Sequence, residues 1–301
     1  MSARADVHGI LLLDKALGLS SAAAVARAKY LLGARKAGHT GSLDPLATGL
    51  LPVCFGEATK FGAHLLDADK AYRVIARLGE RTASADLESA VIETRILPPF
   101  TSDQIASALR DFPRDYDQVP PMHSAIKQDG KPLYLYARAG QTRERESRRI
   151  AIREIKLLSW CAPDVEFEVR CSKGAYIRVL AEDLASLLGT IAHLTALRRL
   201  SVAPFEAARL WTFEALQDMS LPERRAILLP VDAALGYAPR YDLPASQVSA
   251  LRQGQTLQVP VGAPGTVRIY SDELGFLGLG ELELPGRLVP LRLISAGVNR
   301  A

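Results

Sequence analysis

Apolar residues recur at strand and helix spacings through the first 200 residues, so the chain predicts both kinds of element. Residues 72–78 and 165–171 place apolar side chains at every second position, which is typical of half-buried strands. Residues 177–188 repeat them at helical spacing and end at Gly189, a residue that readily terminates a helix. The apolar run Ile10–Leu13 predicts a first strand over residues 9–13.

Capping residues and turn residues place the other elements. Ser20 or Ser21 can cap a helix that runs to Leu32 and stops at Gly33, and Thr101 or Ser102 can cap one over 102–110. A further helix is expected over 57–66. Residues 36–49 (KAGHTGSLDPLATG) hold three glycines and one proline, which predicts mostly loop, and Asp129-Gly130 predicts a turn in an inserted segment.

The character of the chain changes near residue 239. Pro230, Pro239 and Pro244 punctuate a short linker, and beyond it short strands are predicted over 257–261, 266–269, 275–283 and 287–294. We therefore expect an α+β fold. A first domain (1–238) has a mixed, antiparallel-rich sheet flanked by helices, and a small β-rich domain follows over 239–301.

Composition adds a large aliphatic core and an uneven charge. The chain has 301 residues, of which 48% are hydrophobic but only 6% aromatic, and a net charge of +4. Residues 131–156 hold eight basic and three acidic side chains, a local charge of +5. A run of this kind is consistent with a solvated loop and equally with a nucleic-acid contact.

Cysteine usage and the N-terminus bear on the compartment. The three cysteines, Cys54, Cys161 and Cys171, are odd in number and lack metal-type spacing, so a disulfide framework and a structural zinc are not expected. The first apolar run is too short for a signal peptide, and no stretch approaches the roughly 18 apolar residues of a membrane span. A reducing cytoplasm fits these features.

One loop carries candidate chemistry. Asp44 precedes Pro45, which disfavours a helical conformation at Asp44, and Gly38, Gly41 and Gly49 permit sharp bends around it. A carboxylate thus sits on a tightly shaped loop close to His39. Taken alone, the local sequence is also consistent with an ordinary Asp-Pro turn that caps the next element.

The full string around this loop resembles a known family. GHTGSLDPLATGLLPVCFGEATKF (38–61) is similar to the signature of the TruB-type pseudouridine synthases, which act on position 55 of bacterial tRNA. Other segments resemble the family's motifs in the same order, and the last of them resembles its C-terminal PUA-like domain, a small RNA-binding β-barrel: GILLLDKALGLSS (9–21), KAYRVIARLGERTASAD (70–86), CSKGAYIRVLAEDL (171–184), AHLTALRRL (192–200) and GFLGLGELELPGRLVPLRLI (275–294).

The resemblance implies an RNA-modifying isomerase. Pseudouridine forms when the N1–C1′ bond of uridine breaks and C1′ joins C5, so no atoms are gained or lost and no cofactor is expected. The expected partner is the T arm of tRNA, the enzyme is expected to act as a monomer without a protein partner, and no metal or membrane is involved. Whether the nucleophile attacks C1′ or the uracil ring stays open.

Three residues match the family's catalytic positions. Asp44 corresponds to the nucleophilic aspartate, and Arg178 corresponds to the arginine that keeps it ionised. Tyr72 corresponds to the tyrosine placed against the target base. Its ring suits stacking on a flipped base, whereas work as a general base is limited by an ordinary phenol pKa of about 10.

Four further residues match positions that contact or surround the flipped uridine. Tyr176 and Leu197 correspond to contacts with the base, although each is equally consistent with core packing. His39 corresponds to the histidine near the space that the base vacates. Asp86 corresponds to an acid that orients Arg178 or another basic group.

The basic run resembles the family's thumb, an insertion over about 120–150 that closes on RNA and contacts phosphates. Two departures stand out. His123 occupies a position usually held by tyrosine, which puts the inner thumb contact in doubt. Leu87-Glu88-Ser89 lacks the usual glycine after Asp86, so the geometry of that turn is uncertain.

Two other functions are compatible with the sequence. One is a related synthase that modifies ribosomal RNA with a guide RNA and protein partners. The other is a non-catalytic module that binds or folds tRNA. The compact chain with its own thumb argues against the first, and intact Asp44, Tyr72 and Arg178 argue against the second.

Overall fold

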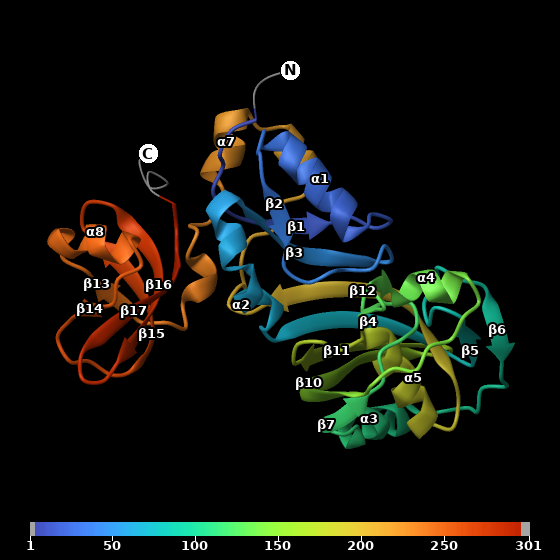
Figure 1. The fold of residues 1–301 in the computed structure, drawn as a ribbon. Coiled ribbons are helices and arrows are strands. Elements are labelled where there is room, and N and C mark those ends of the chain that lie inside the picture. The colour runs from blue at the N-terminus through green and yellow to red at the C-terminus, as the bar shows by residue number, and fades with distance from the viewer. Residues whose placement is uncertain (1–3, 296–301) are drawn as a thin grey trace.

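The computed structural model describes residues 4–295, and eight of the strands in this range belong to one large sheet (Figure 1). The order across it is β1-β3-β12-β4-β11-β10-β7, with β2 paired to β3. All neighbours are antiparallel except β12 and β3, which are parallel. The eight strands are β1 (Gly9–Lys15), β2 (Ala37–His39), β3 (Ala47–Phe55), β4 (Lys70–Leu78), β7 (Asp115–Gln118), β10 (Arg148–Cys161), β11 (Asp164–Cys171) and β12 (Ala192–Val202).

Three helices pack against the large sheet and close its main core. They are α1 (Ser21–Leu31), α3 (Ser102–Asp111) and α5 (Ile177–Leu187). Ser20 caps α1, and Thr101 forms a capping box with Gln104 at the start of α3, as the sequence predicted. The predicted apolar stripe of α5 is buried, with Leu180 and Ala181 fully enclosed.

Strand β1 is buried on both faces, which accounts for its unbroken apolar run. Leu11 and Leu13 belong to the main core under α1. Ile10 and Leu12 belong to a second core on the opposite face, with Leu50 of β3. A strand covered on both sides shows no alternation, so its sequence reads as a continuous hydrophobic run.

The second sheet begins at residue 240. Its five strands follow the order β13-β15-β16-β17-β14 and enclose a small core with Leu251 of α8 (Ala245–Arg252). The strands are β13 (Arg240–Asp242), β14 (Leu257–Gln258), β15 (Gly265–Ser271), β16 (Gly275–Glu283) and β17 (Arg287–Leu293). Strand β14 is shorter than the predicted strand over 257–261, and α8 was not predicted.

The small sheet is packed against the large domain through aromatic and ionic contacts. The rings of Phe61 and Phe276 meet edge to face with centroids 5.5 Å apart, in a cluster that also contains Leu235. Arg268 of β15 binds Asp232 at 3.1 Å. These contacts join the two parts of the chain, which lie beside each other in Figure 1.

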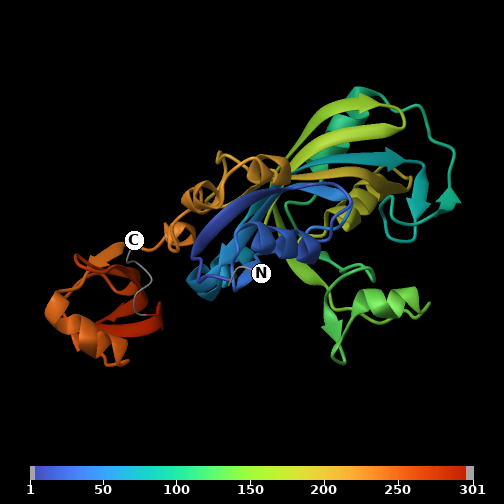
Figure 2. The same cartoon turned by 90° about the horizontal axis from the view of Figure 1, so that it is seen from above.

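Residues 119–147 leave the large sheet between β7 and β10 and project away from it (Figure 2). They contain a short hairpin with Asp129-Gly130 at its turn, as predicted, followed by a helix. Two further short strands, between β4 and α3, form a separate ribbon. These elements are β8 (Lys127–Gln128), β9 (Lys131–Pro132), α4 (Leu133–Arg138), β5 (Glu80–Thr82) and β6 (Val91–Thr94).

Residues 36–49 are mostly loop, as predicted, although β2 and the start of β3 also fall within them. Two other sequence predictions were wrong in detail. The helix predicted over 57–66 is interrupted at Phe61, between the 3-10 turn η1 (Gly56–Lys60) and α2 (Gly62–Leu66). The basic run 131–156 is not one insertion, because residues from Arg148 onward form the long strand β10.

The predicted fold class is confirmed: an α+β large domain with an antiparallel-rich mixed sheet is followed by a small β-rich unit. The connection between them carries α6 (Phe213–Gln217), α7 (Leu221–Ala226) and the 3-10 turn η2 (Ala233–Leu235). Within residues 4–295, no helix combines the length and hydropathy needed to cross a bilayer.

The aromatic contact between the two sheets should contribute to stability. We expect Phe276→Ala to lower the free energy of unfolding by about 3 kcal/mol. The Phe276 side chain is only 5% exposed, so removal of its ring would leave a cavity against Phe61. Urea denaturation followed by circular dichroism measures this loss. Leu291→Ala, at a position 55% exposed, is the control and should change stability by less than about 0.5 kcal/mol. Equal effects of the two substitutions would contradict a packed interface.

Candidate active site

A cleft of about 650 Å³ opens where the loop after β2 meets β4, β12 and the start of α5. Gly41 to Asp44 form one wall, and Tyr72, Leu197 and Arg199 lie on the strands. Residues 66–67, 70, 124–126, 148–150 and 172–178 complete the lining. Segments that are far apart in sequence thus meet around one carboxylate.

The Asp44 loop is held in place by its neighbours. The Ser21 hydroxyl donates to the Leu43 carbonyl at 3.0 Å and accepts from the Leu43 amide at 2.7 Å. The Pro45 carbonyl accepts from the Gly18 amide at 2.9 Å and from Lys15 Nζ at 3.5 Å. These contacts fix the backbone on both sides of Asp44, as catalytic positioning requires.

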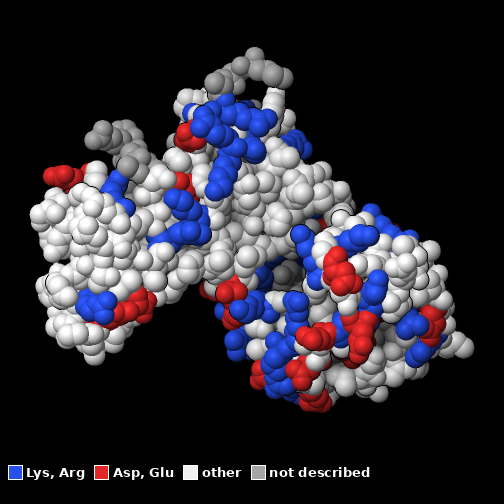
Figure 3. Space-filling model, viewed as in Figure 1, with Lys and Arg blue, Asp and Glu red and all other residues white. Residues whose placement is uncertain are grey.

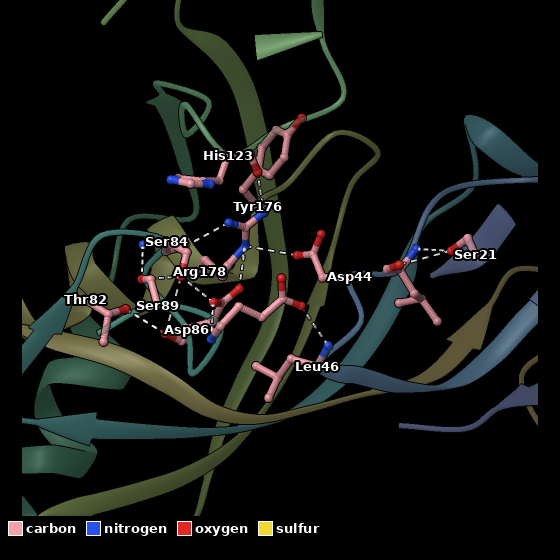
Figure 4. Close-up of polar contacts among 12 residues, drawn as sticks. Ser21, Asp44, Leu46, Thr82, Ser84, Asp86, Ser89, His123, Tyr176 and Arg178 are labelled. Carbon is pink, nitrogen blue, oxygen red and sulfur yellow. Dashed lines mark hydrogen bonds and ion pairs between the residues drawn. The ribbon is translucent and has the colours of Figure 1, made fainter. Parts of the chain in front are cut away.

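Asp44 and Arg178 form an ion pair in the cleft, with Arg178 Nε 3.0 Å from Asp44 Oδ2 (Figure 4). The guanidinium makes two more hydrogen bonds, from Nη1 to the Ser84 carbonyl at 2.8 Å and from Nη2 to the His123 carbonyl at 2.7 Å. The planar group therefore joins three chain segments, and one of its nitrogens reaches the carboxylate.

Burial raises the pKa of Asp44 above its ordinary value, and the neighbouring Asp86 carboxylate raises it further. Arg178 and Lys15 act in the opposite direction by favouring the charged form. Even so, the Asp44 side chain remains 41% exposed, because it faces the open space of the cleft. A carboxylate that is accessible yet weakly solvated is suited to nucleophilic attack.

Tyr72 lies on β4 with 7% exposure and belongs both to the cleft wall and to the main core. Burial raises the pKa of its hydroxyl, and the nearby Arg199 guanidinium only partly offsets this. The phenolate is therefore scarcer than for an ordinary tyrosine. This favours stacking over general-base work for Tyr72.

Tyr176 and Leu197 both line the cleft. Gln118 holds the Tyr176 backbone at both its groups, accepting from the amide at 2.7 Å and donating to the carbonyl at 3.1 Å. Leu197, 8% exposed, lies on β12 opposite Val74 of β4 and Ala47 of β3. Both positions can contact an occupant of the cleft.

Asp86 and His39 lie outside the cleft lining. Asp86 is 2% exposed, and its Oδ2 lies 3.7 Å from Arg178 Nε, which agrees with an orienting position. His39, at the end of β2, has a buried Nδ1 without a hydrogen-bond partner, and burial lowers its pKa. His39 thus lies where β2 leads into the Asp44 loop, and its burial favours the neutral imidazole.

Sequence reasoning missed three buried cations near Asp44. Arg199 donates to the carbonyls of Leu50 at 2.7 Å and Gly41 at 3.1 Å. Lys15 and Lys70 also bind main-chain carbonyls, and burial lowers the pKa of each to about 8. A charged residue inside an apolar strand, such as Lys15 after Leu11–Asp14, is the signal that could have identified them.

His123 meets the site through its main chain, since Arg178 binds its carbonyl. The replacement of the usual tyrosine therefore leaves this particular contact intact. Around it, Lys and Arg side chains gather on the part of the molecule that holds β7, β10, β11 and residues 119–147, with acidic side chains among them (Figure 3). Several are paired, as in Arg153 with Asp69 at 3.1 Å.

Comparison with known proteins covers almost the entire chain. Residues 29–177 match the model of the TruB family pseudouridylate synthase N-terminal domain. Residues 178–236 match the tRNA pseudouridylate synthase B C-terminal domain, and residues 239–294 match the model described as pseudouridine synthase II TruB, C-terminal.

Individual relatives agree with these matches. The tRNA pseudouridine synthase B of Ralstonia nicotianae is 51% identical, with 97% of this chain and 95% of the relative covered. That of Chromohalobacter salexigens is 49% identical, with coverages of 96% and 95%. Among solved structures, a Cbf5-Nop10-Gar1 complex aligns with a TM-score of 0.71 and 26% identity, over 96% of this chain and 84% of that one.

The three contacts of Arg178 should contribute to the stability of the folded protein. We expect Arg178→Lys to lower the free energy of unfolding by about 3 kcal/mol, because a single ammonium cannot reach Asp44 and two carbonyls from one buried position. Arg77→Lys is the matched control, since Arg77 is 38% exposed in its pair with Asp164 and should lose less than about 1 kcal/mol. A loss at Arg178 no larger than at Arg77 would show that the extra bonds are dispensable.

Proposed function

The chain belongs to the TruB family of pseudouridylate synthases, and from this premise we propose that it converts uridine 55 in the T loop of tRNA to pseudouridine. The observation that carries the proposal is the Asp44–Arg178 pair inside a cleft of about 650 Å³. This volume lies in the range of roughly 300–1,000 Å³ typical of sites for small ligands. A single nucleotide flipped out of the loop fits such a site.

Asp44 is the proposed nucleophile. Its carboxylate attacks either C1′ of the ribose or the uracil ring, and the N1–C1′ bond breaks. The detached uracil turns in the cleft and C5 bonds to C1′. The covalent bond to Asp44 breaks, its electron pair returns to the carboxylate, and the proton lost from C5 is balanced by one gained at N1. All atoms and electrons of uridine are retained, so the chemistry requires no cofactor.

The surrounding residues hold the base during this turn. Tyr72 stacks on the uracil, and Tyr176 and Leu197 close the sides of the cleft. Arg178 keeps Asp44 charged and oriented, with Asp86 placed behind it. His39 stands near the space in the RNA that the flipped base leaves.

Residues 120–150 are the proposed thumb, and residues 239–301 the proposed second RNA-binding domain. Exposed Lys131, Arg138, Arg148 and Arg149 can contact phosphates, which gives affinity without base reading. The T loop would then be recognised by its folded shape and its single flipped base. The enzyme acts as a monomer in the cytoplasm and requires no protein partner.

Two rival functions were open from the sequence. Relatives of about 50% identity are named as tRNA enzymes, which argues against a guide-dependent synthase. The aligned chain from the complex with Nop10 and Gar1 shares only 26% of its residues with this protein. A non-catalytic module is opposed by the charged, accessible state of Asp44 beside Arg178. Pseudouridine mapped in purified tRNA after incubation with this protein alone would support the proposed function. A need for added guide RNA would support the guide-dependent synthase, and tRNA binding without catalysis would support the module.

The nucleophile is tested by Asp44→Asn, which keeps the size of the side chain and removes its charge. We expect no detectable turnover and tRNA affinity close to that of the parent. Pseudouridine formed by a preparation free of deamidated protein, as checked by mass spectrometry, would refute the role of Asp44.

The same variant tests the raised pKa of Asp44 through stability. Because the folded state holds the proton more tightly than the unfolded state, ionisation of Asp44 costs stability as the pH rises from its unfolded pKa, about 4, to its raised folded pKa. The melting temperature of Asp44→Asn relative to the parent should therefore rise with pH from about 4 upward and then level off. A relative melting temperature that falls over this range would contradict the direction of the shift.

The second domain is tested through basic side chains that make no ion pair with the described part of the large domain. Arg268 is unsuitable because it is paired with Asp232 at the interface. We expect the triple variant Arg252→Ala, Arg287→Ala, Arg292→Ala to bind full-length tRNA several-fold more weakly and to lose part of its salt dependence. Binding of an isolated T-arm stem-loop, measured in parallel, should be unchanged. Equal weakening for both RNAs would place these arginines at the T arm itself.

A further inference from the structure

The turn that follows β5 contacts Arg178, one member of the ion pair, and the loop that carries the other member, Asp44. The Ser84 carbonyl accepts from Arg178 Nη1 at 2.8 Å, and the Asp86 carboxylate lies 3.7 Å from Arg178 Nε. On the other member's loop, Glu88 Oε1 accepts from the amide of Leu46 at 3.2 Å. Leu46 is two residues beyond the nucleophile Asp44, so residues 84–88 bridge the two halves of the pair.

The turn is built as a fixed platform for this contact. The Ser84 amide donates to Ser89 Oγ at 2.8 Å, and the two serine hydroxyls lie 2.7 Å apart. The Glu88 amide donates to Asp86 Oδ1 at 3.0 Å, and the Thr82 hydroxyl donates to the Asp86 carbonyl at 2.7 Å. Ser89 therefore contributes side-chain bonds at the position where glycine was expected from the family.

The hydrogen bond from the Leu46 amide to Glu88 holds the Asp44 loop on the side that faces Arg178, where Ser21 and Gly18 make no contact. The Ala47 amide turns back to the Asp44 carbonyl at 3.0 Å, while Ser21 and Gly18 hold the loop from the side of α1. Figure 4 shows Ser21 on one side of Asp44 and Arg178 on the other, with Leu46 bonded toward the Arg178 side. Glu88 thus acts opposite Ser21.

We propose that Glu88 is a positioning residue of this active site, whose carboxylate fixes the Asp44 loop against Arg178. The inference rests on the proposed function, and it assigns Glu88 no contact with uridine, because Glu88 is absent from the cleft lining. The side chain acts through the backbone of Leu46.

Charge gives the proposal a second readout. The groups that face Asp44 are the cations Arg178 and Lys15 with Tyr72, Tyr176, Asp86 and Glu88. Burial and then Asp86 raise the pKa of Glu88, and the carboxylates of Glu88 and Asp44 each favour protonation of the other. Neutralising Glu88 should therefore move the acidic limb of the pH–rate profile to lower pH.

The test compares Glu88→Gln, which keeps an oxygen acceptor, with Glu88→Ala, which removes it. At saturating tRNA and pH 8, we expect the single-turnover rate of Glu88→Ala to fall about tenfold, with RNA affinity within about twofold. Glu88→Gln should retain the rate within about threefold and show the shifted acidic limb. A rate for Glu88→Ala equal to the parent, or a loss confined to RNA affinity, would overturn the proposal.

Hydrogen exchange at the Leu46 amide tests the same contact in the free protein. Protection should fall in Glu88→Ala and persist in Glu88→Gln, whereas Glu273→Ala, at an exposed site in the second domain, should change neither exchange nor rate. Unchanged protection in Glu88→Ala would also overturn the proposal. Parent enzyme that forms no pseudouridine would count against the proposed function alone, since the exchange result does not depend on activity.

Discussion

The site depends on keeping a carboxylate charged where water is scarce. Burial and a second acid both oppose ionisation of Asp44, and Arg178 is the nearest group that counteracts them. Arg178 can do so because its other nitrogens are bonded to the carbonyls of Ser84 and His123, which hold the guanidinium in place. The ion pair and the folding of three separate segments are therefore one constraint, since loss of any segment releases the arginine.

A second constraint is the close approach of backbones beneath the Asp44 loop. Gly49 has φ +96°, and a Cβ there would lie 2.2 Å from the Arg199 carbonyl, so only glycine lets β3 run beside β12 at this point. Arg199 then turns its side chain under the loop, to the carbonyls of Leu50 and Gly41. The spacing of the two strands and the floor of the cleft are set together.

The sequence predicted several elements whose apolar period is regular, and it missed two long strands of the large sheet whose register is broken. Residues 72–78 and the stripe of α5 were identified because their burial follows a constant period. The central strand β12 was not, because irregularities at Leu194/Ala196 and Arg199/Ser201 shift its pattern, and β10 contains two similar shifts. In the site, the motif resemblance pointed to Asp44 and Arg178, but Arg199 gains its partners, the carbonyls of Leu50 and Gly41, only through tertiary contacts.

The bond from Arg178 to the His123 carbonyl has a mechanical meaning. His123 lies at the base of residues 119–147, the segment that projects from the sheet between β7 and β10 (Figure 2). A displacement that moves the His123 carbonyl would therefore change a bond to the side chain that pairs with Asp44. Residues 119–147 and the Asp44 carboxylate are thus connected through one side chain, Arg178.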